Sequence, residues 1–199
     1  MEKVGVEHHA VIFALLAKEC ILTKGKAGEK TILDAVALYG QERGRRMAAY
    51  AKENGDELNP VSYQIYSEWQ SETGEMQAEA GNHNGRFMTQ ITVCDWCEAW
   101  KKHGLLEYGN YYCQAVDKNL YYGFNPQLSL QVLSTLSNGS KICAFDWGAE
   151  FTAQDYAFMQ SRLQQIGRRY IRDFSYHTAH ILSTVSNQIL ADFGSEGQA

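Results

Sequence analysis

A thiol and a carboxylate four residues apart, Cys113 and Asp117, are the residues of this sequence best suited to chemistry. Their segment has helical periodicity, and residues four apart on a helix project from the same face. A thiolate is a strong nucleophile once its charge is stabilised, and a carboxylate in apolar surroundings costs free energy unless it has a partner. We therefore expect Asp117 to bind a cationic ligand group such as an amidinium, or to orient a histidine.

Activation of Cys113 requires a cation or a base, and no histidine is adjacent to it in the sequence. The partner must come from another segment, and the candidates are His8, His9, His83, His103 and the pair His177 and His180. Of these we assign the catalytic role to His8 and His9. A solvated helix start is the alternative for these two histidines. Cys113 itself fits a small buried apolar side chain as well as it fits a nucleophile.

Four of the five cysteines lie close together in the sequence: Cys94, Cys97, Cys113 and Cys143. A zinc-stabilised structural module is one interpretation, but only the first two cysteines have the spacing of a zinc knuckle. Cys143 alternates with apolar residues on a predicted strand, where it either packs in the core or contacts a substrate. An odd number of cysteines in a chain of this size favours free thiols in a reducing compartment. We predict no bound metal and no cofactor.

Helices and a small antiparallel sheet must position these groups. Helical periodicity covers four segments: residues 7–22, 31–54, 108–122 and 155–193. Thr31 is the expected cap of the second helix, after a turn at Gly25 and Gly28. Gly167 interrupts the last segment, which is either one long helix or two. In the second helix Gly40 and Gly44 share a face, which would let another helix approach closely.

Strand signals are concentrated between residues 91 and 147. Residues 128–136 and 141–147 alternate between apolar and polar and flank an Asn-Gly turn, which predicts an antiparallel hairpin. Residues 91–94 also alternate, whereas residues 74–90 are polar with three glycines. The stretch 81–85 around His83 indicates a loop. The order of elements indicates an α+β fold, with helices packed on a small antiparallel sheet and a long C-terminal helical segment. We expect a domain over 1–150 and a helical extension over 151–199 that packs on it or forms a dimer seam.

Composition argues against several classes of partner. The formal net charge is −5, and the sequence lacks the basic character of a nucleic-acid-binding surface. No run of 18 apolar residues could cross a membrane. The first residues include Glu2 and Glu7 and lack the basic region of a secretory signal. We therefore expect a cytoplasmic protein that acts on a small molecule, without nucleic-acid or membrane partners.

In combination these motifs resemble the L-2-amino-thiazoline-4-carboxylic acid hydrolase family. The residues that carry the resemblance are Cys94, Tyr112-Cys113-x-x-x-Asp117, Gly123-Phe124-Asn125-Pro126, Gly139-x-x-x-Cys143-x-Phe145, and, nearer the start, His8-His9-Ala10 and Tyr39-Gly40-x-x-x-Gly44. The same pattern is more distantly similar to 4-vinyl reductase and TRAPP-like ligand-binding domains. Those domains have an α+β fold and are often dimeric, so the resemblance also implies a homodimer.

The resemblance implies a hydrolase that opens an aminothiazoline carboxylate ring to N-carbamoyl-cysteine. Cys113 would add to the ring carbon between sulfur and the two nitrogens while Asp117 holds the protonated amidine. In an alternative route, water attacks directly and Asp117 or a histidine is the base. The expected substrate-binding residues are Asn125, Tyr121, Cys143 and Arg86, with the arginines among residues 43–46 as further candidates for the substrate carboxylate. A non-catalytic small-ligand sensor on the same fold is the alternative from another class.

Overall fold

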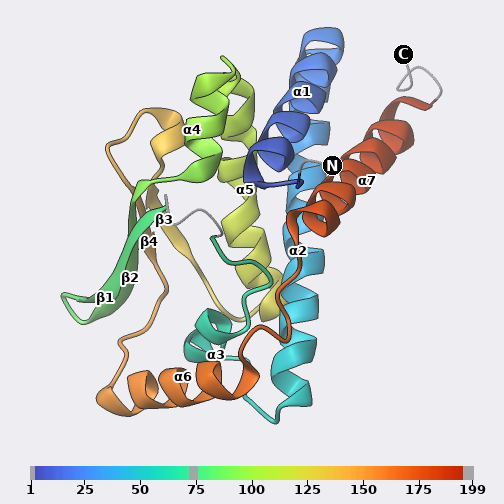
Figure 1. Cartoon of the computed structure of the whole chain (residues 1–199). Helices are drawn as coiled ribbons and strands as arrows, with labels where there is room; N and C mark the ends of the chain where they lie inside the picture. Colours follow the sequence, from blue (N-terminus) through green and yellow to red (C-terminus); the bar gives the residue numbers. More distant parts are fainter. Residues whose placement is uncertain (1–2, 72–75, 195–199) are drawn as a thin grey trace.

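The computed structural model describes residues 3–71 and 76–194. Its helices are α1 (Val6–Lys24), α2 (Lys26–Glu53), α3 (Pro60–Ile65), α4 (Asp95–Lys102), α5 (Leu106–Phe124), α6 (Ala153–Ile166) and α7 (Phe174–Phe193). Its strands are β1 (Gln77–His83), β2 (Arg86–Val93), β3 (Gln131–Ser134) and β4 (Cys143–Asp146). The strands form one antiparallel sheet in the order β1-β2-β4-β3, and helices cover it (Figure 1). The predicted α+β class, with its small antiparallel sheet and C-terminal helices, is confirmed.

Helices α2 and α5 pack directly against each other in the middle of the molecule (Figure 1). A Cβ atom on Gly44 would lie 2.1 Å from the carbonyl oxygen of Leu120, and one on Gly40 would lie 2.8 Å from that of Val116. Both distances are far shorter than a carbon–oxygen contact, so only glycine fits. The predicted close approach at the two glycines is confirmed, and it brings α2 against the part of α5 that carries Asp117.

The hydrophobic core is divided into two clusters of buried side chains. The first joins α1, α4 and α7 to the early part of α5, with Phe13 and Trp100 fully buried in it. The second joins α3 and the sheet to the late parts of α2 and α5, with Tyr66 and Phe124 at its centre. Helices α2 and α5 run through both clusters, so residues midway along them lie where the two clusters meet.

Residues 77–93 form a β-hairpin, and its turn lies in the stretch 81–85 that was predicted as a loop. Residues 74 and 75 lie outside the described residues. Strands β1 and β2 pair antiparallel, and the described part of this hairpin projects from the body of the molecule (Figure 1). Asn84 and Gly85 both have positive φ, 51° and 74°, as in the two-residue hairpin turns that favour Asn-Gly. Strand β1 is an edge strand whose side chains are nearly all exposed, so it lacks the apolar alternation of a half-buried strand.

The second predicted hairpin is confirmed, with shorter strands. Strands β3 and β4 pair antiparallel, and between them the short 3-10 helix η1 (Leu136–Asn138) takes part of the connection. The loop is therefore longer than a two-residue Asn-Gly turn. Its backbone folds back onto β4, where the amide of Leu136 donates a hydrogen bond to the Cys143 sulfur at 3.2 Å.

Helix α2 begins earlier than predicted. Gly25, with φ of 57°, alone separates it from α1, and Gly28 lies inside the helix rather than in a turn. Thr31, the expected cap, is buried within α2, where its hydroxyl donates a hydrogen bond to Asp192 of α7 at 2.6 Å. The prediction of a helix start at Thr31 is therefore wrong, because the Thr31 hydroxyl bonds to another helix and does not cap the backbone of α2.

The C-terminal segment forms two helices that break at Gly167, one of the two predicted arrangements. Helix α6 packs on α3, whereas α7 lies along α1 and α2 (Figure 1).

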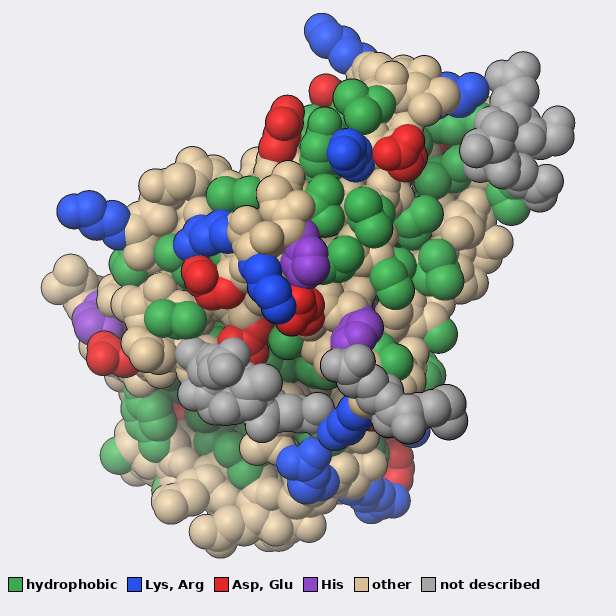
Figure 2. All heavy atoms as spheres, turned by 45° about the horizontal axis from the view of Figure 1, so that its top comes forward, with side chains coloured by type: hydrophobic (Ala, Val, Ile, Leu, Met, Phe, Trp, Pro, Cys, Tyr) green, Lys and Arg blue, Asp and Glu red, His purple; other side chains and the backbone are tan. Residues whose placement is uncertain are grey.

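Hydrophobic side chains gather between charged ones on the end of the molecule that holds α1 and α7 (Figure 2), and Leu15 and Leu22 of α1 are exposed. The predicted homodimer stays a prediction. Within the described ranges, no helix is long and apolar enough to cross a membrane.

Candidate active site

A cavity of about 290 Å³ lies where the two core clusters meet, between the sheet and helices α2, α3 and α5. Its polar lining comes mainly from the helices: Arg43, Tyr63, Tyr112, Cys113 and Asp117. Its apolar lining comes largely from the sheet and the flanking segments: Met76, Ala78, Ile91, Phe145, Trp147, Trp69 and Trp96. The structure therefore brings Cys113 and Asp117 into one cavity, as their spacing predicted.

Asp117 faces the cavity without a polar partner among the residues that the structure describes. Burial raises the pKa of its carboxyl to about 6, and the positive charge of Arg43 opposes this shift only in part. A half-buried carboxylate without hydrogen bonds is unfavourable, because water no longer solvates it fully. Asp117 is therefore available to a ligand that brings a cationic hydrogen-bond donor.

Arg43 is the cation of the cavity. Its side chain is only 5% exposed, and its Nε donates a hydrogen bond to Oε2 of Glu68 at 3.4 Å. The fully buried Glu68 is held mainly by Arg46, through contacts of 2.8 and 3.0 Å. The two Nη groups of Arg43 have no hydrogen bond to any residue in the described ranges. Glu68 thus fixes the guanidinium from behind and leaves its outer donors for an anion.

Cys113 is the most accessible thiol of the cavity. It is half-buried, whereas Cys94 and Cys143 are buried. Burial raises the pKa of Cys143 to about 11, and a hydrogen bond with the Cys97 thiol raises that of Cys94 well above its usual value. The pKa of Cys97 rises to about 12, first because of its hydrogen bond with Cys113. Cys113 is therefore the thiol best placed to attack a ligand.

The cysteines do not form a metal site in this arrangement. No three His, Cys, Asp or Glu side chains in residues 3–71 and 76–194 are placed to share one metal ion. The five thiols are all free. The zinc-stabilised module suggested by the Cys94-x-x-Cys97 spacing consequently has no support in the geometry.

The predicted partnership of Cys113 with His8 or His9 is not formed. His8 is exposed at the start of α1, where its Nδ1 accepts a hydrogen bond from the Gly5 amide at 3.2 Å. His9 is buried behind the cavity wall, with the rings of Trp96 and Tyr112 at 6.1 and 5.8 Å. Burial, helped by the charge of Arg43, lowers the pKa of His9 to about 3. No histidine of the described residues lines the cavity.

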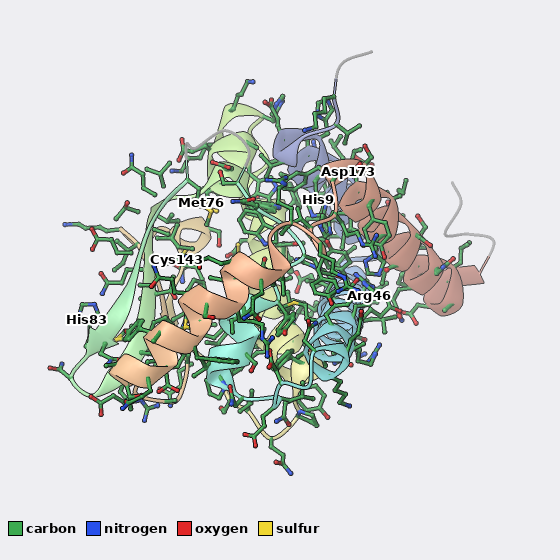
Figure 3. All side chains as sticks on the ribbon, turned by 60° about the horizontal axis from the view of Figure 1, so that its bottom comes forward. His9, Arg46, Met76, His83, Cys143 and Asp173 are labelled. Carbon is green, nitrogen blue, oxygen red and sulfur yellow. The ribbon has the colours of Figure 1, made fainter. Side chains whose placement is uncertain are left out.

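Figure 3 shows how the histidines lie relative to the site. Cys143 lies between the sheet and the helices, whereas His9 is on the side of α1. His83 is at the outer end of the β1–β2 hairpin. Asp117 is the sole carboxylate of the cavity among the described residues, which makes it the candidate base.

Three predicted substrate-binding residues lie outside the cavity lining. The Asn125 amide donates a hydrogen bond to a backbone carbonyl in the segment before α3 at 2.7 Å, so it fixes the end of α5. The Tyr121 hydroxyl donates one to the carbonyl of Trp147 at 3.0 Å behind the cavity wall. Arg86 pairs with Asp146 on the exposed side of the sheet at 3.0 Å. Cys143 does line the cavity, and so does Arg43 from the arginines at 43–46 that were further candidates for the substrate carboxylate.

Sequence reasoning did not single out Arg43, and it missed Tyr63, Trp69 and Tyr112 as lining residues. The sequence shows a basic cluster at 43–46 but does not indicate which of its arginines is buried. Gly40 was a usable signal, because a residue three positions after it falls on the same helix face. An arginine on the face that packs against another helix must be buried, and a buried arginine requires a partner.

Comparison with known proteins supports one assignment. A search among curated proteins and a search among solved structures found no match. The family model of L-2-amino-thiazoline-4-carboxylic acid hydrolase matches residues 5–147, more than half of the chain. Every residue that lines the cavity, from Arg43 to Trp147, falls within this range. As the motifs predicted, the chain belongs to the L-2-amino-thiazoline-4-carboxylic acid hydrolase family.

Proposed function

We propose that this protein hydrolyses a small cyclic amidine of the aminothiazoline carboxylate type in the cavity between α5 and the sheet. The observation that carries the proposal is the pair of opposite charges that face this cavity, Asp117 and Arg43, each with unused hydrogen-bonding capacity. Such a substrate carries an amidinium and a carboxylate on one small ring. It therefore offers each charge its counterpart.

Arg43 is the anchor for the substrate carboxylate. Its two Nη groups can donate a parallel pair of hydrogen bonds, the arrangement in which arginine binds carboxylates most strongly. Glu68 holds the guanidinium by Nε and so orients these donors without occupying them. Positioning of this kind lowers the entropy lost when the substrate binds.

Asp117 binds the amidinium and acts as the base. One carboxylate oxygen accepts hydrogen bonds from the amidinium, which keeps the ring carbon between sulfur and nitrogen electrophilic. The other oxygen is free to accept a proton. A base works best when its pKa lies near the working pH, and burial raises the pKa of Asp117 to about 6.

Cys113 is the nucleophile, one helical turn before Asp117 on α5. The carboxylate accepts the thiol proton, a bond forms between the Cys113 sulfur and the ring carbon, and the bond from that carbon to the ring sulfur breaks. The ring sulfur leaves as a thiol with the proton from Asp117. Water then gives a proton to Asp117 and adds to the same carbon, and the Cys113 sulfur leaves and regains the proton. One water is consumed, both carbon–nitrogen bonds survive, and the amidinium proton passes to solvent, so the product is neutral at its urea group, as in N-carbamoyl-cysteine.

Direct attack by water is the competing route. The cavity offers Asp117 as a base but no histidine, among described residues, to assist a thiol. In that route Asp117 deprotonates water and Cys113 only lines the wall. The two routes share their substrate, product and charged groups, and they differ in whether a bond to Cys113 forms.

The proposal is tested by incubating the purified protein with 2-amino-thiazoline-4-carboxylate and following N-carbamoyl-cysteine by mass spectrometry. The wild-type protein should form product, and Asp117→Asn should lower kcat by about 10²–10⁴-fold, the usual contribution of a general base. Asp34→Asn, which changes an exposed carboxylate of α2, is the matched control and should retain the wild-type rate. Binding without any product in the wild type would instead identify a small-ligand sensor and refute the hydrolase.

A further inference from the structure

The cavity is polar on one side and apolar on the other. Arg43, Asp117 and the Tyr63 and Tyr112 side chains come from the helices. The sheet side presents side chains that offer a ligand no charge and few hydrogen bonds: Ala78, Ile91, Cys143, Phe145 and Trp147. A ligand that uses both charged groups must therefore turn its remaining edge toward apolar side chains.

Two pairs of aromatic rings also line the cavity. Trp69 and Trp96 pack edge to face, with ring centroids 5.0 Å apart, in the first core cluster. Tyr63 and Trp147, with centroids 5.1 Å apart, belong to the second cluster. The cavity is lined by both pairs, and three of the four tryptophans in the chain line it. Flat aromatic groups gain from contacts with such rings beyond the area that they bury.

The cavity is also large for an unsubstituted ring. Its volume of about 290 Å³ approaches the ~300 Å³ at which sites for drug-sized ligands begin. A five-membered ring that carries only an amino group and a carboxyl group fills the polar side and leaves the apolar side empty. Protein interiors hold few voids of that size. Water would find few hydrogen-bond partners among these apolar side chains, so it would not fill the space favourably.

We infer that the substrate carries an aromatic substituent on the ring carbon between the sulfur and the carboxylate-bearing carbon. This inference rests on the proposed function, because it takes the ring to be held by Arg43 and Asp117. With the carboxylate on Arg43 and the amidinium on Asp117, the edge formed by the ring sulfur and that carbon faces the apolar side. An aryl group there meets the aromatic rings that line the cavity.

The test compares 2-amino-thiazoline-4-carboxylate with its 5-phenyl derivative as substrates of the full chain. The phenyl compound should have a kcat/KM at least about tenfold higher, the lower end of what one added apolar group contributes in a fitting pocket. Ile91→Phe places a ring in the apolar side and should reduce this preference to none or reverse it. Thr92→Ser, on the exposed neighbouring position of β2, should retain the preference. If Ile91→Phe fails to fold, Ala78→Phe on the exposed edge strand makes the same test.

The outcomes separate this inference from the proposed function. Hydrolysis of the unsubstituted ring at an equal or higher kcat/KM overturns the inference and leaves the function intact. If neither compound is hydrolysed, the proposed hydrolase function is refuted. The affinity of each compound, measured by titration of tryptophan fluorescence, then tests the preference for an aromatic substituent separately. At least about tenfold tighter binding of the phenyl compound supports it. Equal or weaker binding overturns it.

Discussion

Asp117 of α5 and Arg43 of α2 line one cavity from neighbouring helices without forming an ion pair with each other. Opposite charges buried in a protein normally pair, because an unpaired buried charge is costly. Here Arg43 uses only its Nε, on Glu68, while burial keeps the pKa of Asp117 raised. The separation costs stability in the empty protein, and it leaves both groups ready for a substrate that carries both charges.

This cost predicts that Asp117→Asn stabilises the protein in a pH-dependent way. The folded-state pKa of about 6 lies above the ordinary 3.8, so folding favours the protonated carboxyl. That contribution is fully present below the unfolded-state pKa and is lost as pH rises through about 6. The loss amounts to at most roughly 3 kcal/mol, and an asparagine, which has no proton to lose, avoids it.

Urea denaturation of both proteins at about pH 5 and about pH 8 measures the effect as a difference in unfolding free energy. The advantage of Asp117→Asn over wild type should be larger at the higher pH. Asp34→Asn removes an exposed carboxylate and should show no such change between the two pH values. If the difference in unfolding free energy between Asp117→Asn and wild type is the same at both pH values, Asp117 is solvated in the folded protein.

Local periodicity explains which features of the site were predictable. Cys113 and Asp117 were placed on one helix face, and Gly40 and Gly44 on another, from spacing alone. Both predictions depend on only one helix, whose period of 3.6 residues is insensitive to the rest of the fold. The two glycines also showed where a second helix must pack, though not that it is the helix that carries Cys113.

Features that depend on packing between distant segments were not predictable in the same way. His9 has the residue type of a base, but the packing of α1 buries it among rings behind the cavity. Strand β1 is an exposed edge strand, so burial imposes no alternation on its sequence. The neighbouring Asn84-Gly85 was a readable turn signal, since this pair is strongly favoured in two-residue hairpins.

Arg43→Lys tests the carboxylate anchor. Lysine retains the charge but not the paired donors, and Glu68 keeps its contacts with Arg46. Charged hydrogen bonds contribute about 1.5–3 kcal/mol, so kcat/KM should fall roughly 10–100-fold with 2-amino-thiazoline-4-carboxylate. With 2-aminothiazoline, which has no carboxylate, the same variant should change kcat/KM by less than about threefold.

Arg46→Lys is the matched control for this experiment, because Arg46 holds the same Glu68 but does not line the cavity. Its effect should be the same on both substrates. If Arg43→Lys also lowers kcat/KM equally for both substrates, Arg43 supports the fold of the site and does not bind the substrate carboxylate.

Cys113→Ser separates the two chemical routes. If the sulfur forms a bond to the ring carbon, serine, a much poorer nucleophile at neutral pH, should lower kcat by several orders of magnitude. Rapid acid quenching of the wild type should also trap an adduct on Cys113 with the full mass of the substrate, because the opened ring stays attached through its carbon. Cys143→Ser, which changes another thiol of the same cavity, should still form this adduct. Wild-type turnover by Cys113→Ser would leave direct attack by water as the route.

Gly44→Ala tests whether the contact between α2 and α5 holds the charged groups in place. The added methyl group would lie 2.1 Å from the carbonyl oxygen of Leu120 and 2.5 Å from the amide nitrogen of Phe124, both backbone atoms that cannot move aside alone. The helices must separate, and overpacking of this kind costs about 1–3 kcal/mol, which lowers Tm by roughly 5–10 °C in a chain of this length. Gly81→Ala on the exposed strand β1, where an added methyl group meets no atom within 4 Å, should not lower Tm. Because the separation also moves Arg43 away from Asp117, kcat/KM measured well below the new Tm should fall more for the carboxylate substrate than for 2-aminothiazoline, and equal losses would contradict this coupling.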